Sequence, residues 1–429
     1  MKINLKELSS TEREMEFELT WEDVEKDYSK FVKKFVKDIT LPGFRKGMVP
    51  MNIVEKKFGA QIDYDFINDK FADYYGTALD EKELNPVSQA ELLDLDFKKG
   101  TPLKLKVKFE VMPDWKMPKY KDGFPLEDLT YVIEAEDIDE SIYNLRENAA
   151  EVRVVDEGAK SGYHLIADVQ ELGHEGEVLN ESKDSRIVLG KDPFDGDTEK
   201  ELLGVKAGET RTISLHAGDD HDHDHEFKLS IKNVEEHILP EVDDEFAQTV
   251  DPDTENLKTL KEKIKVELEN YWKRQADSRM EEQIADYFIE KLKDVVLPKT
   301  VVEEQAKNIY EDIKKRYPSE KEMDEKAILE NYSDSAEKSL KWQLVKNKIV
   351  KDNEIKVEDE DVNARLTEML KDVNEELRDS YKKYYQSPQV KDQLHDDIMN
   401  IKIIDHIKSF AKMKTKKITR KARLKELGR

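Results

Sequence analysis

Two hydrophobic periods alternate along the first 112 residues. Apolar residues recur at every second position in two short stretches, which predicts strands with one buried face. These positions are Ile3, Leu5, Met15, Phe17 and Leu19. From Val24 to Ile39 the spacing becomes helical, and two further helices are predicted, near 52–58 and from about 62 to 81. In the closing stretch LKLKVKFEV, residues 103–111, the apolar side chains share one face. The pattern predicts an α+β domain over residues 1–112.

The rest of the chain changes character twice. Residues 113–150 form a connector with a Pro- and Gly-bearing stretch, an extended LTYVIEA and a helix from Asp137. Residues 151–239 place glycines between short runs such as HLIADVQEL, RTISL and FKLSIKNV, which is typical of a small β-rich domain. Residues 240–429 carry helical apolar stripes, and the basic last twenty residues are expected to pack poorly. The predicted helix breaks fall at Pro298, Pro318 and Pro388. We expect 113–150 and 240–429 to form one helical body, with 151–239 inserted.

The amino-acid composition excludes several classes of function. The chain has 429 residues, 39% of them charged, with a net charge of -25, so several domains with much charged surface are expected. Non-specific wrapping of nucleic acid is disfavoured except at local basic patches. The absence of cysteine excludes disulfides, thiolate zinc sites and cysteine nucleophiles. Neither a signal-peptide core nor a run of membrane-spanning length is found, so a soluble, cytoplasmic protein with no membrane partner is expected.

A loop with candidate chemistry follows the first predicted helix. In LPGFRKGMVP, residues 41–50, Pro42 and Gly43 end the helix, Gly47 permits another bend, and Pro50 suits the first turn of the next helix. Between the glycines lie one large apolar ring and two cations, which suit a large, negatively charged partner. The preceding helix adds a basic face. Its residues are Lys26, Lys30, Lys33, Lys34 and Lys37. An ordinary solvated loop between helices is the alternative interpretation.

The pattern Gly-Phe-Arg-x-Gly-x-x-Pro in this context resembles the ribosome-docking signature of bacterial trigger factor. The resemblance extends through KFGA, KFEVMPDW, GVKAGE and LPEVDDEFA to the helical C-terminal region. It implies a ribosome-docking domain, an inserted FKBP-like domain and an all-helical chaperone domain with arms. It also implies a ribosome-associated chaperone for nascent or unfolded polypeptides, with dimerisation of the free protein. The implied ribosome-binding residues, which would meet a ribosomal protein and rRNA beside the exit tunnel, are Gly43, Phe44, Arg45, Lys46, Gly47 and Pro50.

Nothing in the sequence indicates a cofactor. The chain lacks Gly-x-x-x-x-Gly-Lys-Ser/Thr, so nucleotide-driven release of clients is not expected. Many weak apolar sites on helical arms can hold an unfolded segment and still release it. Individual client-contact residues cannot be chosen from the sequence.

The middle segment departs from the family at its prolyl isomerase site. Such enzymes surround proline with an aromatic groove that desolvates the imide. Aligned along GVKAGE, the groove positions become Val169, Val178 (or Leu179) and Thr198, and Phe227 is the aromatic that remains. A shifted alignment could rebuild the groove from Phe194 or Tyr163. We therefore expect the fold to persist with weak or absent activity, and an active isomerase is the alternative.

An acidic, histidine-rich loop replaces part of that groove. Imidazoles and carboxylates alternate in HAGDDHDHDH, a composition that can bind zinc or nickel. The candidate ligands are His216, His221, His223 and His225. A solvated surface loop with incidental metal affinity is the simpler interpretation. A metal-binding scaffold is thus the third functional hypothesis, after the chaperone and the isomerase.

Overall fold

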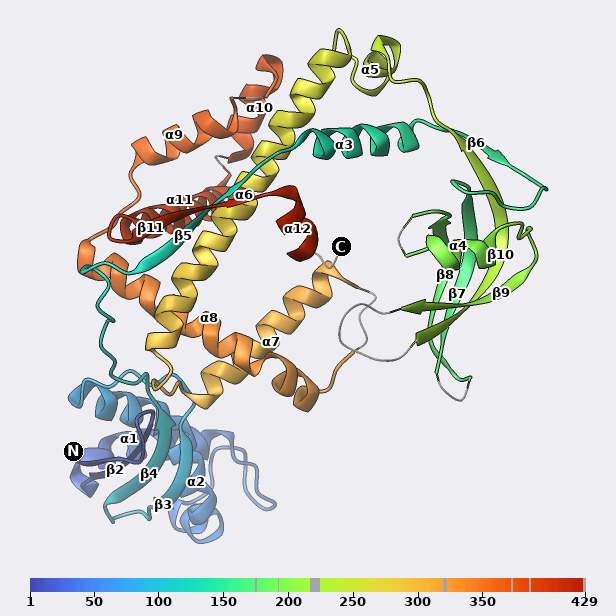
Figure 1. Cartoon of the computed structure of the whole chain (residues 1–429). Coiled ribbons are helices and arrows are strands. Elements are labelled where there is room, and N and C mark those ends of the chain that lie inside the picture. Colours follow the sequence, from blue (N-terminus) through green and yellow to red (C-terminus); the bar gives the residue numbers. More distant parts are fainter. Residues whose placement is uncertain are drawn as a thin grey trace. The chain divides into compact units, whose positions relative to one another are not determined.

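The structure is a computed structural model that describes the chain except for residues 174–175, 192, 217–223, 319–321, 372, 386 and 427–429. The described residues form two compact units, and each unit is built from separate stretches of the chain (Figure 1). The first unit contains Met1–Phe124 and Glu282–Lys412, and the second contains Pro125–Glu281 and Met413–Arg429. No helix in the part of the chain that the structure describes is long and apolar enough to cross a membrane.

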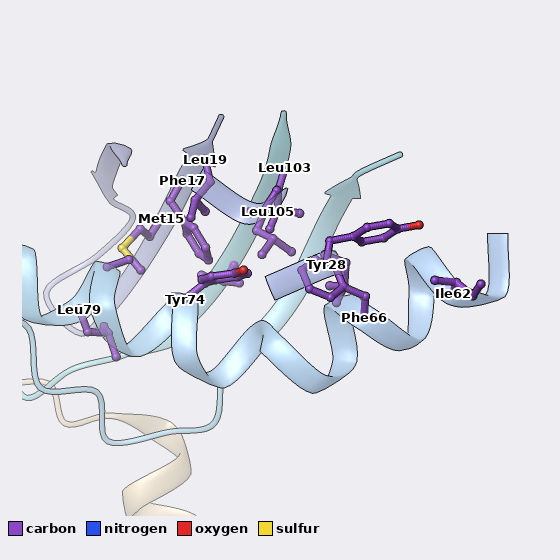
Figure 2. Close-up of a cluster of buried hydrophobic side chains, with 14 of the residues drawn as sticks. Met15, Phe17, Leu19, Tyr28, Ile62, Phe66, Tyr74, Leu79, Leu103 and Leu105 are labelled. Atoms are coloured by element: carbon purple, nitrogen blue, oxygen red, sulfur yellow. The ribbon is translucent and has the colours of Figure 1, made fainter. Parts of the chain in front are cut away.

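The N-terminal part of the first unit is an antiparallel sheet packed against two helices. Its strands are β1 (Lys2–Glu7), β2 (Glu12–Leu19), β3 (Glu91–Asp96) and β4 (Leu103–Glu110), in the order β1-β2-β4-β3. The helices are α1 (Trp21–Asp38) and α2 (Met51–Glu81). Figure 2 shows Phe17 and Leu105 from neighbouring strands beside Phe66 and Tyr74 of α2 in one core. The predicted α+β fold of this part of the chain is confirmed.

Helix α2 corrects one expectation, because it is continuous where the sequence predicted two helices. Gly59 does not interrupt it, although glycine in a helix costs about 1 kcal/mol relative to alanine. Val54, Ile62 and Phe66 lie eight and four residues apart and are all buried against the sheet. Their burial is worth about 1.5–3 kcal/mol per side chain and outweighs the propensity of a single glycine.

The C-terminal part of the first unit is helical, as predicted. Its helices are the end of α6 (Leu257–Lys291), α7 (Lys299–Arg316), α8 (Glu325–Asn353), α9 (Asp359–Met369), α10 (Glu375–Tyr385) and α11 (Pro388–Lys408). Each predicted proline break coincides with a helix boundary: α7 starts after Pro298, ends before Pro318, and α11 starts at Pro388. Proline fixes φ and lacks an amide hydrogen, so it suits the start of a helix and ends a preceding one.

The second unit contains a β-rich segment between helices. The elements before and within that segment are β5 (Pro125–Tyr131), α3 (Ala135–Asn148), β6 (Glu151–Val154), β7 (His164–Leu172), β8 (Val178–Val188), α4 (Gly196–Leu202), β9 (Thr210–His216) and β10 (Asp224–Ile238). The middle sheet runs β6-β10-β7-β8, and β9 also pairs with β10. Its core includes Leu165, Ile213 and Leu229, with Leu202 of α4. Helix α5 (Asp244–Val250) and most of α6 follow. The prediction of a β-rich middle segment is confirmed.

The basic C-terminal tail is packed, which contradicts the expectation from sequence. Residues Lys412–Ile418 form strand β11, which pairs with β5, and Arg420–Glu426 form helix α12. Ile418 and Arg423 are 4% and 3% exposed. The cause is the acidic start of α3, whose carboxylates accept hydrogen bonds from the tail's arginines. The proposed boundaries 1–112, 113–150, 151–239 and 240–429 stay predictions.

Candidate functional site

The loop between α1 and α2 begins with a tight turn. The amide of Phe44 donates to the carbonyl of Leu41 at 3.0 Å, across Pro42 and Gly43. Gly43 has a φ of +92°, which suits the third position of a type II turn, and proline suits the second. Helix α1 has already ended at Asp38, as the proline and glycine predicted.

A second turn follows at once. The amide of Met48 donates to the carbonyl of Arg45 at 2.9 Å, with Gly47 in the third position at a φ of +75°. The amide of Gly47 also donates to the carbonyl of Ile39 at 3.3 Å, which closes the base of the loop against the end of α1. A Cβ atom at Gly47 would lie 3.1 Å from the carbonyl oxygen of Lys37. Both the backbone angle and the close approach therefore require glycine here.

The two turns present the predicted docking side chains to solvent. Phe44 is 37% exposed, and Arg45 and Lys46 are exposed as well. Within the described residues neither cation lies within ion-pair distance of a carboxylate. The five lysines of α1 are also exposed, and of these Lys30 lies 3.5 Å from Asp27. The loop and helix thus form a local positive surface on an acidic protein.

Val49 anchors the loop, and the sequence analysis did not single it out. It is 4% exposed and belongs to the buried core of the N-terminal domain. Met48 and Met51, on either side of Val49 and Pro50, are 71% and 43% exposed and add apolar surface to the loop. The sequence feature that could have predicted the burial of Val49 is an apolar residue between Gly47 and Pro50. Its burial fixes the loop's base while the tip stays free.

The predicted groove residues of the middle segment lie in different environments. Val169 of β7 and Phe227 of β10 pack against the buried core of the sheet. Val178, the first residue of β8, is 51% exposed, and Thr198 lies half-buried on α4. The two aromatics of the shifted alignment, Tyr163 and Phe194, also pack against that core. Weak or absent prolyl isomerisation at these positions stays a prediction.

The histidine-rich loop falls mostly outside the described residues. His216 ends β9 and pairs with Asp224 at the start of β10, where His225 follows. His221 and His223 lie outside the described part of the chain, and so do the side chains of His216 and His225. The metal hypothesis for this loop stays a prediction.

An exposed apolar stripe lies on α10. Leu377, Tyr381 and Tyr384 are 52%, 43% and 60% exposed. Their spacing of four and then three residues places them on one face of the helix. The sequence could not choose these residues, because the exposure of one helix face depends on which neighbours cover it.

Together these features define a modular protein with a presented basic loop and a helical region carrying exposed apolar side chains. The family model described as Bacterial trigger factor protein (TF) matches residues 1–145, and the model for the trigger factor C-terminus matches residues 256–409. The trigger factor of Geobacillus thermodenitrificans is 30% identical over 394 residues, covering 87% of this chain and 91% of the relative. That of Chlorobium phaeobacteroides is 27% identical over 414 residues, covering 95% and 96%.

A solved structure titled "Promiscuous Substrate Recognition in Folding and Assembly Activities of the Trigger Factor Chaperone" covers 94% of this chain and 98% of its own, at 20% identity and a TM-score of 0.44. On the family models and the relatives, the chain belongs to the trigger factor family. That membership supports a role as a ribosome-associated chaperone.

Proposed function

We propose that this chain docks beside the polypeptide exit tunnel through the loop Gly43–Pro50 and holds nascent chains on its helical region without ATP. The observation that carries the docking proposal is the exposed tip, Phe44 to Lys46, above a base fixed by Val49. A rigid base lowers the entropy cost of binding because the contact residues are already arranged.

Each tip residue contributes differently to docking. Arg45 and Lys46 neutralise rRNA phosphates or carboxylates of a ribosomal protein, and a guanidinium can do so with two parallel hydrogen bonds. Phe44 supplies apolar contact area that becomes desolvated in the interface. The lysine face of α1 adds a longer-range attraction that raises the association rate and weakens with salt.

Co-sedimentation with ribosomes tests the docking proposal. The variant Phe44→Ala/Arg45→Ala/Lys46→Ala should lose at least about tenfold in affinity, since hot-spot side chains cost about 1–2 kcal/mol or more each. Its melting temperature should stay close to wild type, because all three side chains are exposed. The matched control is Lys82→Ala/Lys98→Ala, which removes the same two charges from exposed positions of the same domain. An equal loss of ribosome affinity in both variants would indicate a non-specific effect of charge and contradict the proposal.

Client binding is assigned to the exposed stripe of α10. Its three side chains offer apolar contact without a closed pocket, which suits weak, reversible contact with many unfolded sequences. Release then follows when the client folds and buries its own apolar residues. Dimerisation of the free chain stays a prediction, and sedimentation velocity would detect it.

Suppression of client aggregation tests this assignment. The variant Leu377→Ser/Tyr381→Ser/Tyr384→Ser should suppress aggregation less well while still binding ribosomes. The control Tyr64→Ser/Val296→Ser/Tyr317→Ser removes one aliphatic and two tyrosine side chains that are 60%, 60% and 62% exposed elsewhere. If both variants lose the same activity, the α10 stripe has no specific role.

A further inference from the structure

Three side chains from separate elements meet on one face of the middle sheet. His164, the first residue of β7, pairs with Glu235 of β10, so the two side chains share a face. His237 lies two residues further along β10 and shares that face too. Glu147, in the last turn of α3, places Oε2 at 3.2 Å from His164 Nε2 and 3.1 Å from His237 Nδ1. We call Glu147, His164 and His237 the junction triad.

The triad is buried, and some of its imidazole nitrogens lack a hydrogen-bond partner among the described residues. The side chains of His164 and His237 are 5% and 3% exposed, and that of Glu147 is 16% exposed. Among the described residues, Nδ1 of His164 and Nε2 of His237 have no hydrogen-bond partner, and Nε2 of His164 lies 3.2 Å from Glu147 Oε2 without hydrogen-bond geometry. Buried polar atoms are normally paired, so these ring nitrogens suit a further partner.

Donor spacing in the triad fits a small cation. The three potential ligand atoms lie within 4.8 Å of one another. A tetrahedral zinc ion with bonds of about 2.0–2.1 Å separates its ligand atoms by about 3.3 Å, close to the spacing of the carboxylate oxygen from each imidazole. The rings are stacked, with centroids 3.6 Å apart and planes 6° apart. An imidazole binds a metal in its ring plane, so one ring must turn about its Cβ–Cγ bond when an ion enters.

Carboxylates face both imidazoles of the triad. Burial, and then the neighbouring His237, lowers the pKa of His164. Burial raises the pKa of Glu147, but the Tyr143 hydroxyl and both imidazoles outweigh it and lower the pKa overall. Glu235 places a second carboxylate oxygen 3.6 Å from His237 Nε2. The positive charge of Arg186 also lowers the pKa of His164.

Neighbouring side chains hold the carboxylate in place. The Tyr143 hydroxyl donates to Oε1 of Glu147, and burial raises the pKa of Tyr143 to about 12, so the proton stays available. The Lys191 ammonium lies 3.7 Å from the centre of the Tyr143 ring. Such outer partners fix the orientation of metal ligands and strengthen binding. Here Lys191, in the segment after β8, contacts α3 through Tyr143.

We propose that Glu147, His164 and His237 form a binding site for a divalent transition metal ion of the zinc type, which joins α3 to the middle sheet. Two imidazoles and one carboxylate, with no thiolate in the chain, suit Zn²⁺, Co²⁺ or Ni²⁺ better than Mg²⁺ or Ca²⁺. Three protein ligands leave a fourth position for water. None of its three residues belongs to the histidine-rich loop or to the loop of residues 41–50.

Calorimetric titration with ZnCl₂ tests the proposal. The histidine-rich loop would bind the same ions, so the full chain carries His216→Asn, His221→Asn, His223→Asn and His225→Asn and is first treated with a chelator. This loop-substituted chain should bind one zinc ion. Adding His164→Gln, His237→Gln or Glu147→Gln should weaken binding about tenfold or more. Glu136→Gln on α3 and His395→Gln on α11 replace exposed groups and should leave zinc binding unchanged.

Two outcomes would overturn the proposal: no zinc binding by the loop-substituted chain, or unchanged binding after His164→Gln. Circular dichroism checks that each variant is folded. If the triad variants fail to fold, the visible spectrum of Co²⁺ bound to the loop-substituted chain decides instead. Strong bands of a four-coordinate ion bound by nitrogen and oxygen support the site. The weak spectrum of aqueous Co²⁺ contradicts it.

Discussion

Arg423 donates a hydrogen bond to the carboxylate of Asp137, a residue 286 positions earlier in the chain. Its guanidinium also donates to the carbonyl of Val132 at 2.8 Å and lies 4.8 Å from the centre of the Trp272 ring. A buried arginine of the C-terminal helix α12 therefore connects the segment after β5, α3 and α6 within the second unit.

Replacing Arg423 should destabilise that unit. Arg423→Ala removes one of the two arginines that pair with the carboxylate of Asp137, whose side chain is 12% exposed, while Arg420 stays 3.1 Å away. Losing a hydrogen bond to a charged group costs about 1.5–3 kcal/mol. We expect a clearly lower melting temperature in differential scanning calorimetry. Lys421→Ala, an exposed cation of the same helix, is the control and should melt like wild type. Equal melting temperatures for all three proteins would show that the tail contributes no stability.

The two loop glycines should respond differently to alanine. Both have positive φ, which costs a residue with a Cβ atom about 1–2 kcal/mol. A Cβ at Gly47 would also crowd the carbonyl of Lys37 at 3.1 Å, whereas a Cβ at Gly43 would meet no atom of the described residues within 4 Å. Gly47→Ala should therefore weaken ribosome binding more than Gly43→Ala. Co-sedimentation at several ribosome concentrations measures the difference, and the reverse order would show that the turn at Gly47 is dispensable.

His406 should make stability depend on pH near neutrality. Burial, and then the positive charge of Lys121, lowers the pKa of His406, whose Nε2 lies 3.2 Å from the Tyr120 hydroxyl oxygen. The unfolded chain, with an ordinary histidine pKa near 6.5, then binds a proton more readily than the folded chain. The folded state is thus favoured above pH 6.5, and this contribution is lost as pH falls from there toward the lowered pKa.

Substitution of His406 checks the sign. His406→Gln keeps a hydrogen-bonding group near Tyr120 but cannot titrate. As the pH falls from 7.5 to about 5.8, the melting temperature of this variant should therefore fall less than that of the wild-type protein. Thermal unfolding in matched buffers gives the comparison. Parallel pH curves for the two proteins would exclude His406 as a source of the dependence.

Residues 151–239 should be removable. Strand β6 enters the middle sheet beside the end of β10, and Glu151 and Ile238 are direct antiparallel partners, so the two ends of the segment are adjacent. Joining Ala150 to Pro240 through a short glycine-serine linker keeps the Arg146 hydrogen bond to the Pro240 carbonyl. The shortened chain should stay folded and suppress client aggregation. A shortened chain that lacks helical circular dichroism would show that the segment is structurally required.

Prolyl isomerase activity should be weak or absent. The uncatalysed barrier is near 20 kcal/mol, and an apolar groove must lower it without a nucleophile or metal. Val178 is largely exposed, and Thr198 brings a hydroxyl to a position expected to hold a ring. A protease-coupled assay with an Ala-Leu-Pro-Phe peptide measures the rate. A robust rate that falls after Phe227→Ala, Phe194→Ala or Tyr163→Ala would show that the aromatics on this core form a working groove.

The periodic segments were predictable because their pattern matches their packing. The alternation in residues 103–111 identified β4, since one face of that strand is buried. The glycines that separate the short runs of the middle segment identified β7. Strand β3 lacks this signal, because Leu92 and Leu93 are both about 45% exposed and pairing with β4 alone makes it a strand. The prediction of two helices where α2 is continuous was wrong for the converse reason, since packing outweighed the low helix propensity of Gly59.

The sequence by itself determined the two turns of residues 41–50, because proline and glycine constrain the backbone locally and the charge between them needs no partner within the chain. It also determined the class of each segment through hydrophobic period. Only the tertiary structure decided that the basic tail packs, because Arg423 is buried through contact with Asp137, far away in sequence. The junction triad was likewise invisible, since the pairing of β7 with β10 and the position of α3 bring together Glu147, His164 and His237, and no local pattern encodes that proximity.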